Sequence, residues 1–304
     1  MKRILSLSLI LLFLLGGCKK AEKNTKPQAT EKGKIQVVTT IFPPYDFLRE
    51  LAGDSAEITM LLPPDSESHN YEPSLSDLSA ISKCDLFVYV GGEIDPWAET
   101  ALSGSYKEGR RAIKLMDLVD TEHTHNGETH SDEHIWTSPE LVMEMVKKLA
   151  DTLSEVDPEH SAVYNGNKAE YIDKLVKLHG DFQRVAKGGR NKTLVFADRF
   201  PFHHFCESYS LAAVTALPGC SSDTEPTLTA VKDMVEAVKK NKIPAVLYTE
   251  TADGEIAKRV MEGTGCEKRL FHSCHSVTAD ELENGESYIS LMEQNLKVLE
   301  EVLS

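Results

Sequence analysis

Four histidines stand close together in residues 122–136, which read EHTHNGETHSDEHIW. They are His123, His125, His130 and His134, and no run of apolar residues among them could bury them in a core. Neutral imidazole is the commonest protein ligand for metals and suits zinc, copper and nickel, and carboxylates stand beside it here. The stretch therefore predicts binding of a divalent cation, with a merely histidine-rich polar loop as the alternative for the first three.

His134 differs from the other three because it ends this loop. Ile135 and Trp136 follow it directly, and Ser138 and Pro139 then have the residue types of a helix N-cap and a first-turn proline. A side chain with such neighbours is held in one place, as a metal ligand must be. His134 is therefore predicted to belong to a fixed site.

The first residues indicate export. A charged start, a short apolar run and a small-residue end make residues 1–17 a secretory signal that is too short to span a membrane. The segment LGGC that ends at Cys18 resembles a bacterial lipobox, with an ordinary signal peptide and an incidental cysteine as the alternative. Residues 18–34 are too polar to bury anything and predict a flexible tether behind a lipidated Cys18. We therefore expect an extracytoplasmic protein that is anchored to the bacterial membrane by lipid.

Composition narrows the function further. The formal net charge of −15 argues against a nucleic-acid partner and is compatible with a cationic ligand, although solubility explains it as well. Five cysteines remain beyond Cys18, and an odd count outside the cytoplasm leaves at least one thiol unpaired. They are Cys84, Cys206, Cys220, Cys266 and Cys274.

Strands alternate with helices in residues 35–157, which predicts an N-terminal α/β lobe that includes the histidine-rich loop, residues 121–134. Apolar residues at helical spacing then predict one long connecting helix over residues 158–188, and residues 189–304 repeat the alternation as a C-terminal α/β lobe. The fold class is therefore α/β, with two lobes whose sheets are mostly parallel. We expect the ligand in the cleft between them, outside the carboxyl ends of the strands.

Several motifs together resemble one known family. They are LLPP at residues 61–64, SHNYEPS at 68–74, DLFVYVGG at 85–92 and DEHIWTSP at 132–139. In this order they resemble the zinc/manganese-binding proteins of bacterial ABC importers, and the likeness runs from about Ile35 to the C-terminus. It implies two α/β lobes joined by one backbone helix, a metal in the cleft and delivery to a membrane permease. A histidine-rich loop is typical of the zinc-preferring members.

The resemblance also implies a ligand set. His69 matches the first metal ligand and His134 the second, but Arg199 stands where the third histidine is expected. A guanidinium cannot ligate a cation, so the third ligand must shift. His203 and His204 are the candidates, and Asp198 is a further one.

The fourth family ligand is a carboxylate in the loop after the last strand, and this loop reads FHSCHSV here. His275 falls within one position of it and is expected to supply a ligand, with His272 next. In a strand His272 and Cys274 would share one face and His275 the other, so all three can face one metal only if the chain turns. Cys220 and Cys274 could form a disulfide near the site, or one thiolate could bind zinc.

These observations favour a monomeric, non-enzymatic receptor that passes a divalent cation to an importer. Imidazole ligands favour Zn²⁺ over Mn²⁺, since manganese sites depend more on carboxylates and water, and a manganese receptor is the alternative. His123, His125 and His130 would then collect metal for the main site. Two alternatives come from other classes, a zinc hydrolase and a surface adhesin. The hydrolase is disfavoured because the zinc-protease motif His-Glu-x-x-His is absent from the sequence.

Overall fold

The computed structural model describes residues 33–304 except 106, 126–127, 218, 220–225, 251 and 253. Residues 34–304 form one compact unit. The predicted signal peptide, Cys18, nearly all of the tether, and Cys220 lie outside the described residues. None of the described helices combines the length and the apolar character that crossing a bilayer requires.

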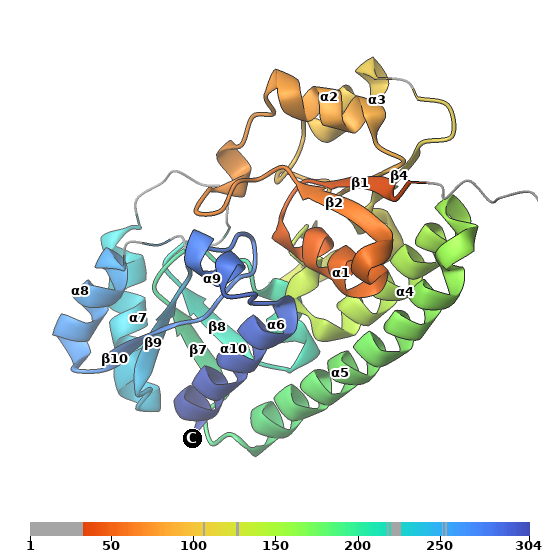
Figure 1. Ribbon diagram of the computed structural model, residues 1–304. Coiled ribbons are helices and arrows are strands. Elements are labelled where there is room, and N and C mark those ends of the chain that lie inside the picture. Colours follow the sequence, from red (N-terminus) through yellow and green to blue (C-terminus); the bar gives the residue numbers. More distant parts are fainter. Residues whose placement is uncertain are drawn as a thin grey trace, which may run out of the picture. The chain divides into compact units, whose positions relative to one another are not determined.

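The first lobe is built on a parallel four-stranded sheet of order β2-β1-β3-β4. Its central strands β1 and β3 are mostly buried because helices cover both faces, whereas the edge strands β2 and β4 are partly exposed. Figure 1 shows α2 and α3 on one side of this sheet and α1 and α4 on the other. The elements are β1 (Ile35–Thr39), α1 (Phe42–Ala52), β2 (Ala56–Met60), α2 (Leu75–Lys83), β3 (Leu86–Tyr89), α3 (Ala98–Gly104) and β4 (Arg111–Lys114).

The second lobe repeats this plan with a parallel sheet of order β10-β9-β7-β8. In both sheets the first strand of the lobe lies between the second and the third, and the fourth pairs with the third. The two sheets therefore share one topology. The elements are β7 (Thr193–Phe196), α6 (His203–Ser208), β8 (Ala212–Thr215), α7 (Leu228–Asn241), β9 (Ala245–Tyr248), α8 (Glu255–Thr264), β10 (Glu267–Leu270), α9 (Ala279–Glu283) and α10 (Tyr288–Leu303).

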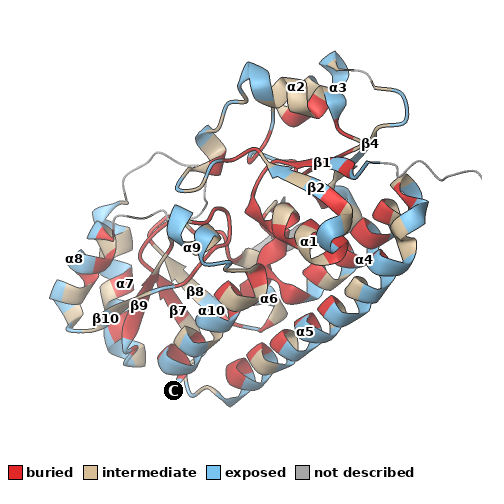
Figure 2. Cartoon of the chain, viewed as in Figure 1, coloured by how far each residue is buried: buried red, intermediate tan, exposed pale blue. Residues whose placement is uncertain are grey.

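One long helix, α5 (Ser161–Gly188), joins the two lobes, as predicted. Its 28 residues span about 42 Å at 1.5 Å per residue. It lies against α4 (Pro139–Val156) of the first lobe and α10 of the second. From Tyr164 to Val185 its buried residues recur every three, four or seven positions, and Figure 2 shows buried positions along one side of the helix. They are Tyr164, Tyr171, Leu175, Leu178, Phe182, Val185 and Ala186.

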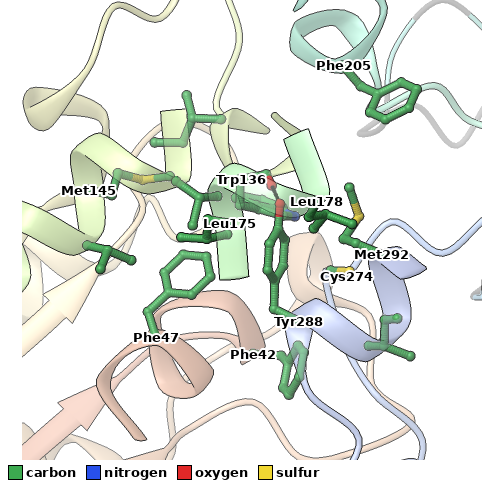
Figure 3. Close-up of a cluster of buried hydrophobic side chains, with 14 of the residues drawn as sticks. Phe42, Phe47, Trp136, Met145, Leu175, Leu178, Phe205, Cys274, Tyr288 and Met292 are labelled. Atoms are coloured by element: carbon green, nitrogen blue, oxygen red, sulfur yellow. Dashed lines mark hydrogen bonds between the residues drawn. The ribbon is translucent and has the colours of Figure 1, made fainter. Parts of the chain in front are cut away.

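The two lobes share one hydrophobic core at this helix. Figure 3 shows Phe47 of α1, Leu175 of α5 and Tyr288 of α10 together with Trp136 in this cluster. The Tyr288 hydroxyl also donates a hydrogen bond of 2.7 Å to the backbone carbonyl of Trp136. Because close-packed cores deform little, such a core restricts hinge motion between the lobes and fixes the loops that leave them.

The histidine-rich stretch differs from the predicted loop. It forms an antiparallel hairpin of β5 (Glu122–His125) and β6 (Glu128–Ser131), in which His123 pairs with His130. Short stretches in which threonines stand among the histidines are compatible with strands, because threonine is β-branched. The side chains of residues 122–130 lie outside the description.

Candidate metal centre

Three loops bring together the three histidines on which the prediction depended most. His69 lies in the short 3-10 turn Ser68–Asn70 after β2, His134 directly precedes the turn Ile135–Thr137, and His275 lies in the loop after β10. The ring centroid of His275 is 5.5 Å from that of His69 and 4.7 Å from that of His134. One nitrogen of each ring lies within 4.8 Å of the others. The two lobes therefore contribute imidazoles to one point.

Each of the first two histidines is held by a carboxylate two residues earlier in the chain. Glu67 Oε1 is 3.4 Å from the backbone nitrogen of His69 and 3.0 Å from its Nδ1. Asp132 Oδ1 accepts from the backbone nitrogen of His134 at 3.0 Å and also from its Nδ1. A side chain that binds both the ring and the backbone of its neighbour fixes the orientation of that ring.

The third histidine is held by a serine in the same position. Ser273 Oγ is 2.7 Å from His275 Nδ1, and it also lies 2.5 Å from Glu250 Oε1. The carboxylate can only accept, so the single hydroxyl proton of Ser273 goes to Glu250, and the hydroxyl accepts from His275 Nδ1–H. A relay from Glu250 through Ser273 thus orients His275.

These hydrogen bonds determine which ring nitrogen is available for a metal. In all three rings Nδ1 donates, so in the neutral ring Nε2 carries the lone pair. Within the described part of the chain, the Nε2 atoms of His69 and His134 are buried and have no hydrogen-bond partner. Buried polar atoms without partners are rare and call for an explanation such as an ion. The arrangement fits a zinc ion bound through Nε2.

The electrostatics of the site favour a cation. Burial lowers the pKa of His69, but the nearby carboxylates of Glu133 and Glu67 outweigh it and raise this pKa to about 9. Burial, followed by the charges of His134 and His69, lowers the pKa of His275 well below its usual range. Burial raises the pKa of Glu133, but the nearby His69 ring and the charge of His134 hold it below its usual value. Ionised carboxylates therefore surround the imidazoles and favour a positive ion at their centre.

The turn that the sequence required in the last loop occurs at Cys274. Its φ of 61° lies in the left-handed region, which few residues other than glycine adopt. The turn separates the two histidines of the loop. His275 faces the cluster, whereas His272 accepts a hydrogen bond from the Cys274 backbone nitrogen at 2.9 Å and its Nε2 lies 3.5 Å from Glu281 Oε1.

The two histidines of α6 lie outside the cluster of imidazoles. His204 Nε2 is 2.9 Å from the backbone carbonyl of Asp132, so it supports the loop of His134. The His203 ring lies edge-on to Phe200, with centroids 4.7 Å apart. Asp198 accepts hydrogen bonds from the backbone and side chain of Thr249.

Arg199 and the cysteines have other positions. Arg199 Nη1 lies 3.5 Å from Glu67 Oε2, so the arginine meets the carboxylate that orients His69. Cys274 is a free, buried thiol, and burial raises its pKa above the usual value. Cys220 lies outside the described residues, so a thiolate ligand from this residue stays a prediction.

The residues that orient the histidines were not predicted from the sequence. Glu67, Asp132 and Ser273 each precede a histidine by two positions, and Glu250 lies far away in the sequence. An oxygen-bearing side chain at the second position before His69, His134 and His275 was the available signal. The contact of Glu250 could not be inferred, because it depends on how the ends of β9 and β10 meet.

We expect Ser273→Ala to lower the zinc affinity by about 10- to 100-fold, because residues that orient ligands have effects of that size. The variant removes the acceptor for His275 Nδ1 and the donor to Glu250, while the imidazole stays. Competition with a chromogenic chelator measures the affinity. Ser82→Ala in α2 is the control, since its hydroxyl binds only the nearby carbonyl of Ser79 in the described structure. Equal affinity of Ser273→Ala and wild type would contradict the relay.

Comparison with known proteins agrees with this geometry. The chain is 31% identical over 286 residues to the zinc-binding lipoprotein AdcA of Streptococcus pneumoniae strain R6, an alignment that covers 90% of this chain and 57% of the relative. The chain therefore spans little more than half the length of that relative. It is also 28% identical over 303 residues to the high-affinity zinc uptake system protein ZnuA of Bacillus subtilis, with 95% and 94% of the two chains covered.

Solved structures show the same fold. The Zn(II)-bound ZnuA-like domain of Streptococcus pneumoniae AdcA matches with a TM-score of 0.75 and 31% identity, over 89% of this chain and 99% of that one. The metal-dependent lipoprotein YcdH of Bacillus subtilis matches with a TM-score of 0.78 and 26% identity, over 89% and 100% of the two chains. The model of the family described as zinc-uptake complex component A, periplasmic, matches residues 37–302. The chain therefore belongs to the family of the zinc-uptake complex component A.

Proposed function

We propose that the protein is an extracytoplasmic receptor that captures Zn²⁺ and delivers it to the membrane permease of an ABC importer. His69, His134 and His275 bind the ion through Nε2. The observation that carries this proposal is the convergence of these three imidazoles, each with its Nδ1 occupied by a neighbouring oxygen. The names of the relatives, a zinc-binding lipoprotein and a zinc uptake protein, support the same assignment.

Zinc is preferred to manganese at such a site. Three imidazole nitrogens suit zinc, whereas Mn²⁺ selects carboxylates, carbonyls and water. The ion is a cargo and takes no part in a reaction, so the protein is a receptor and no enzyme. The lipid on Cys18 and the tether of residues 18–34 keep the receptor close to the permease.

The direct test is equilibrium zinc binding by the purified protein without its signal peptide. We expect one tightly bound Zn²⁺ per chain, weaker binding of Mn²⁺, and no turnover of a panel of peptide and ester substrates by the zinc-loaded protein. Metal analysis, chelator competition and chromogenic assays give these three results. Zinc-dependent hydrolysis would favour the hydrolase, and a failure to bind zinc would refute the receptor.

The hairpin of β5 and β6 is proposed to collect metal without forming the main site. A variant in which alanine replaces His123, His125 and His130 is expected to keep the tight site filled, because the three proposed ligands of that site are other histidines. Zinc-dependent growth at scarce zinc should weaken in cells that carry it. Loss of the tight site in this variant, measured by metal analysis, would contradict the division of roles.

A further inference from the structure

A zinc ion in a protein usually has four ligands, and the three histidines supply three of them. The likeness to the family places a further histidine at residue 199, but this chain has an arginine there. Its guanidinium has donors only and cannot bind a cation. The fourth ligand must therefore be another group of this chain or a water molecule.

Among the described carboxylates, Glu133 has an oxygen close to His69 Nε2, one of the three nitrogens proposed to bind the ion. Its Oε1 lies 3.9 Å from His69 Nε2, and its side chain is 14% exposed. Asp132, Glu133 and His134 form a second group whose possible ligand atoms lie within 4.8 Å of one another. Two ligand atoms on a tetrahedral zinc are about 3.4 Å apart when each bond is about 2.1 Å long. A shift of roughly 0.5 Å would therefore place Glu133 Oε1 and His69 Nε2 at the separation of two ligand atoms on one zinc ion.

Gly92 gives Glu133 the space that it occupies. A Cβ added at Gly92 would lie 3.0 Å from the Cβ of Glu133 and 3.1 Å from its Oε2. Gly92 also has a φ of 70°, which side chains rarely allow. The backbone after β3 thus approaches the Glu133 side chain closely and restricts its movement on that side.

The other two carboxylates near the site hold their histidines at Nδ1, on the far side of the rings, and among the described residues the second oxygen of Asp132 is buried without a hydrogen-bond partner. Asp132 Oδ1 accepts from the backbone and Nδ1 of His134, and Glu67 does the same at His69. An oxygen bound at Nδ1 lies away from the direction in which the Nε2 lone pair points. Glu133 alone among these three approaches a ring at Nε2 in the described structure.

We infer that Glu133 is the fourth ligand, so that three imidazole nitrogens and one carboxylate oxygen hold the zinc. The inference rests on the proposed function, because it concerns the same ion. It assigns three donors, His69, Glu133 and His134, to the N-terminal lobe. His275 then connects the ion to the C-terminal lobe, and Arg199 takes no part as a ligand.

The test compares wild type, Glu133→Gln, Glu133→Ala and the control Glu155→Gln, whose glutamate pairs with Arg111 at the surface. Zinc affinity is measured by chelator competition, and the electronic spectrum of each protein is recorded with Co²⁺ in place of zinc. Co²⁺ absorption depends on the number and type of its ligands, so it reports a ligand change that a supporting role would not cause. Thermal melting without metal shows that each variant is folded.

We expect both Glu133 variants to lose about 100-fold in zinc affinity, which is the upper end of what orienting residues cost. Their Co²⁺ spectra should change in shape and intensity, while Glu155→Gln matches wild type in both measurements. Unchanged affinity, or lower affinity with an unchanged Co²⁺ spectrum, would overturn the inference and leave the receptor intact. Wild type that binds no zinc would refute the proposed function itself.

Discussion

Replacing His134 by alanine is expected to lower the zinc affinity at least about 100-fold, because orienting residues alone account for about 10- to 100-fold. His134 is 4% exposed, and its ring packs edge-on against those of Trp136 and His275. Alanine removes one of the three nitrogens and leaves Asp132 without the imidazole that it orients. Chelator competition measures the loss of affinity. After dialysis, wild type should keep one zinc per chain, whereas His134→Ala should keep less than one.

His160→Ala is the matched control for this prediction. His160 Nδ1 lies 2.6 Å from Asp157 in the turn before α5, and its side chain is 41% exposed. We expect its zinc affinity to equal that of wild type. A loss of less than threefold in His134→Ala, or the same loss in both variants, would contradict the assignment of His134 as a ligand.

Leu175→Ala in α5 is expected to lower the free energy of unfolding by about 2 to 5 kcal/mol, as large-to-small changes in a close-packed core do. Leu175 is fully buried in the core that both lobes share, beside Phe47 and Trp136. Its loss leaves a cavity at the junction of the lobes. Urea unfolding of the metal-free protein, followed by far-ultraviolet circular dichroism, measures the change.

The neighbouring residue gives the control. Val176 is the next residue of α5 and is 54% exposed, so Val176→Ala should change the free energy of unfolding by at most about 0.5 kcal/mol. If Leu175→Ala lowered the free energy of unfolding no more than Val176→Ala does, the shared core would not stabilise the protein as described. Separate unfolding of two lobes would also contradict it.

The order of strands and helices could be predicted from the sequence because each long element carries its own pattern. The apolar stripe of α5 and the buried run of β3 needed no knowledge of their neighbours. The edge strand β4 was missed because none of its residues is buried and only two of them, Ala112 and Ile113, are apolar, so it has no apolar run. The five-residue helix α9 was missed because it is too short for a periodic signal.

For the site, the sequence predicted the histidines but not how they are held. His69 and His134 lie in loops whose neighbouring residues position them, so both positions could be proposed from the chain alone. The preference for His275 over His272 came from its position relative to the family's carboxylate. The left-handed turn at Cys274, which separates the two side chains, could not be predicted because no residue type in this loop indicates it. Glu133 was passed over because its closeness to His69 joins two loops far apart in the sequence.

The measurement that tests the account most directly is a crystal structure of the zinc-loaded protein with anomalous data collected at the zinc absorption edge. We expect one strong anomalous peak between the lobes, about 2.0 to 2.1 Å from the Nε2 atoms of His69, His134 and His275. A peak bound only by residues of one lobe, or one that lies outside these three histidines, would contradict the account.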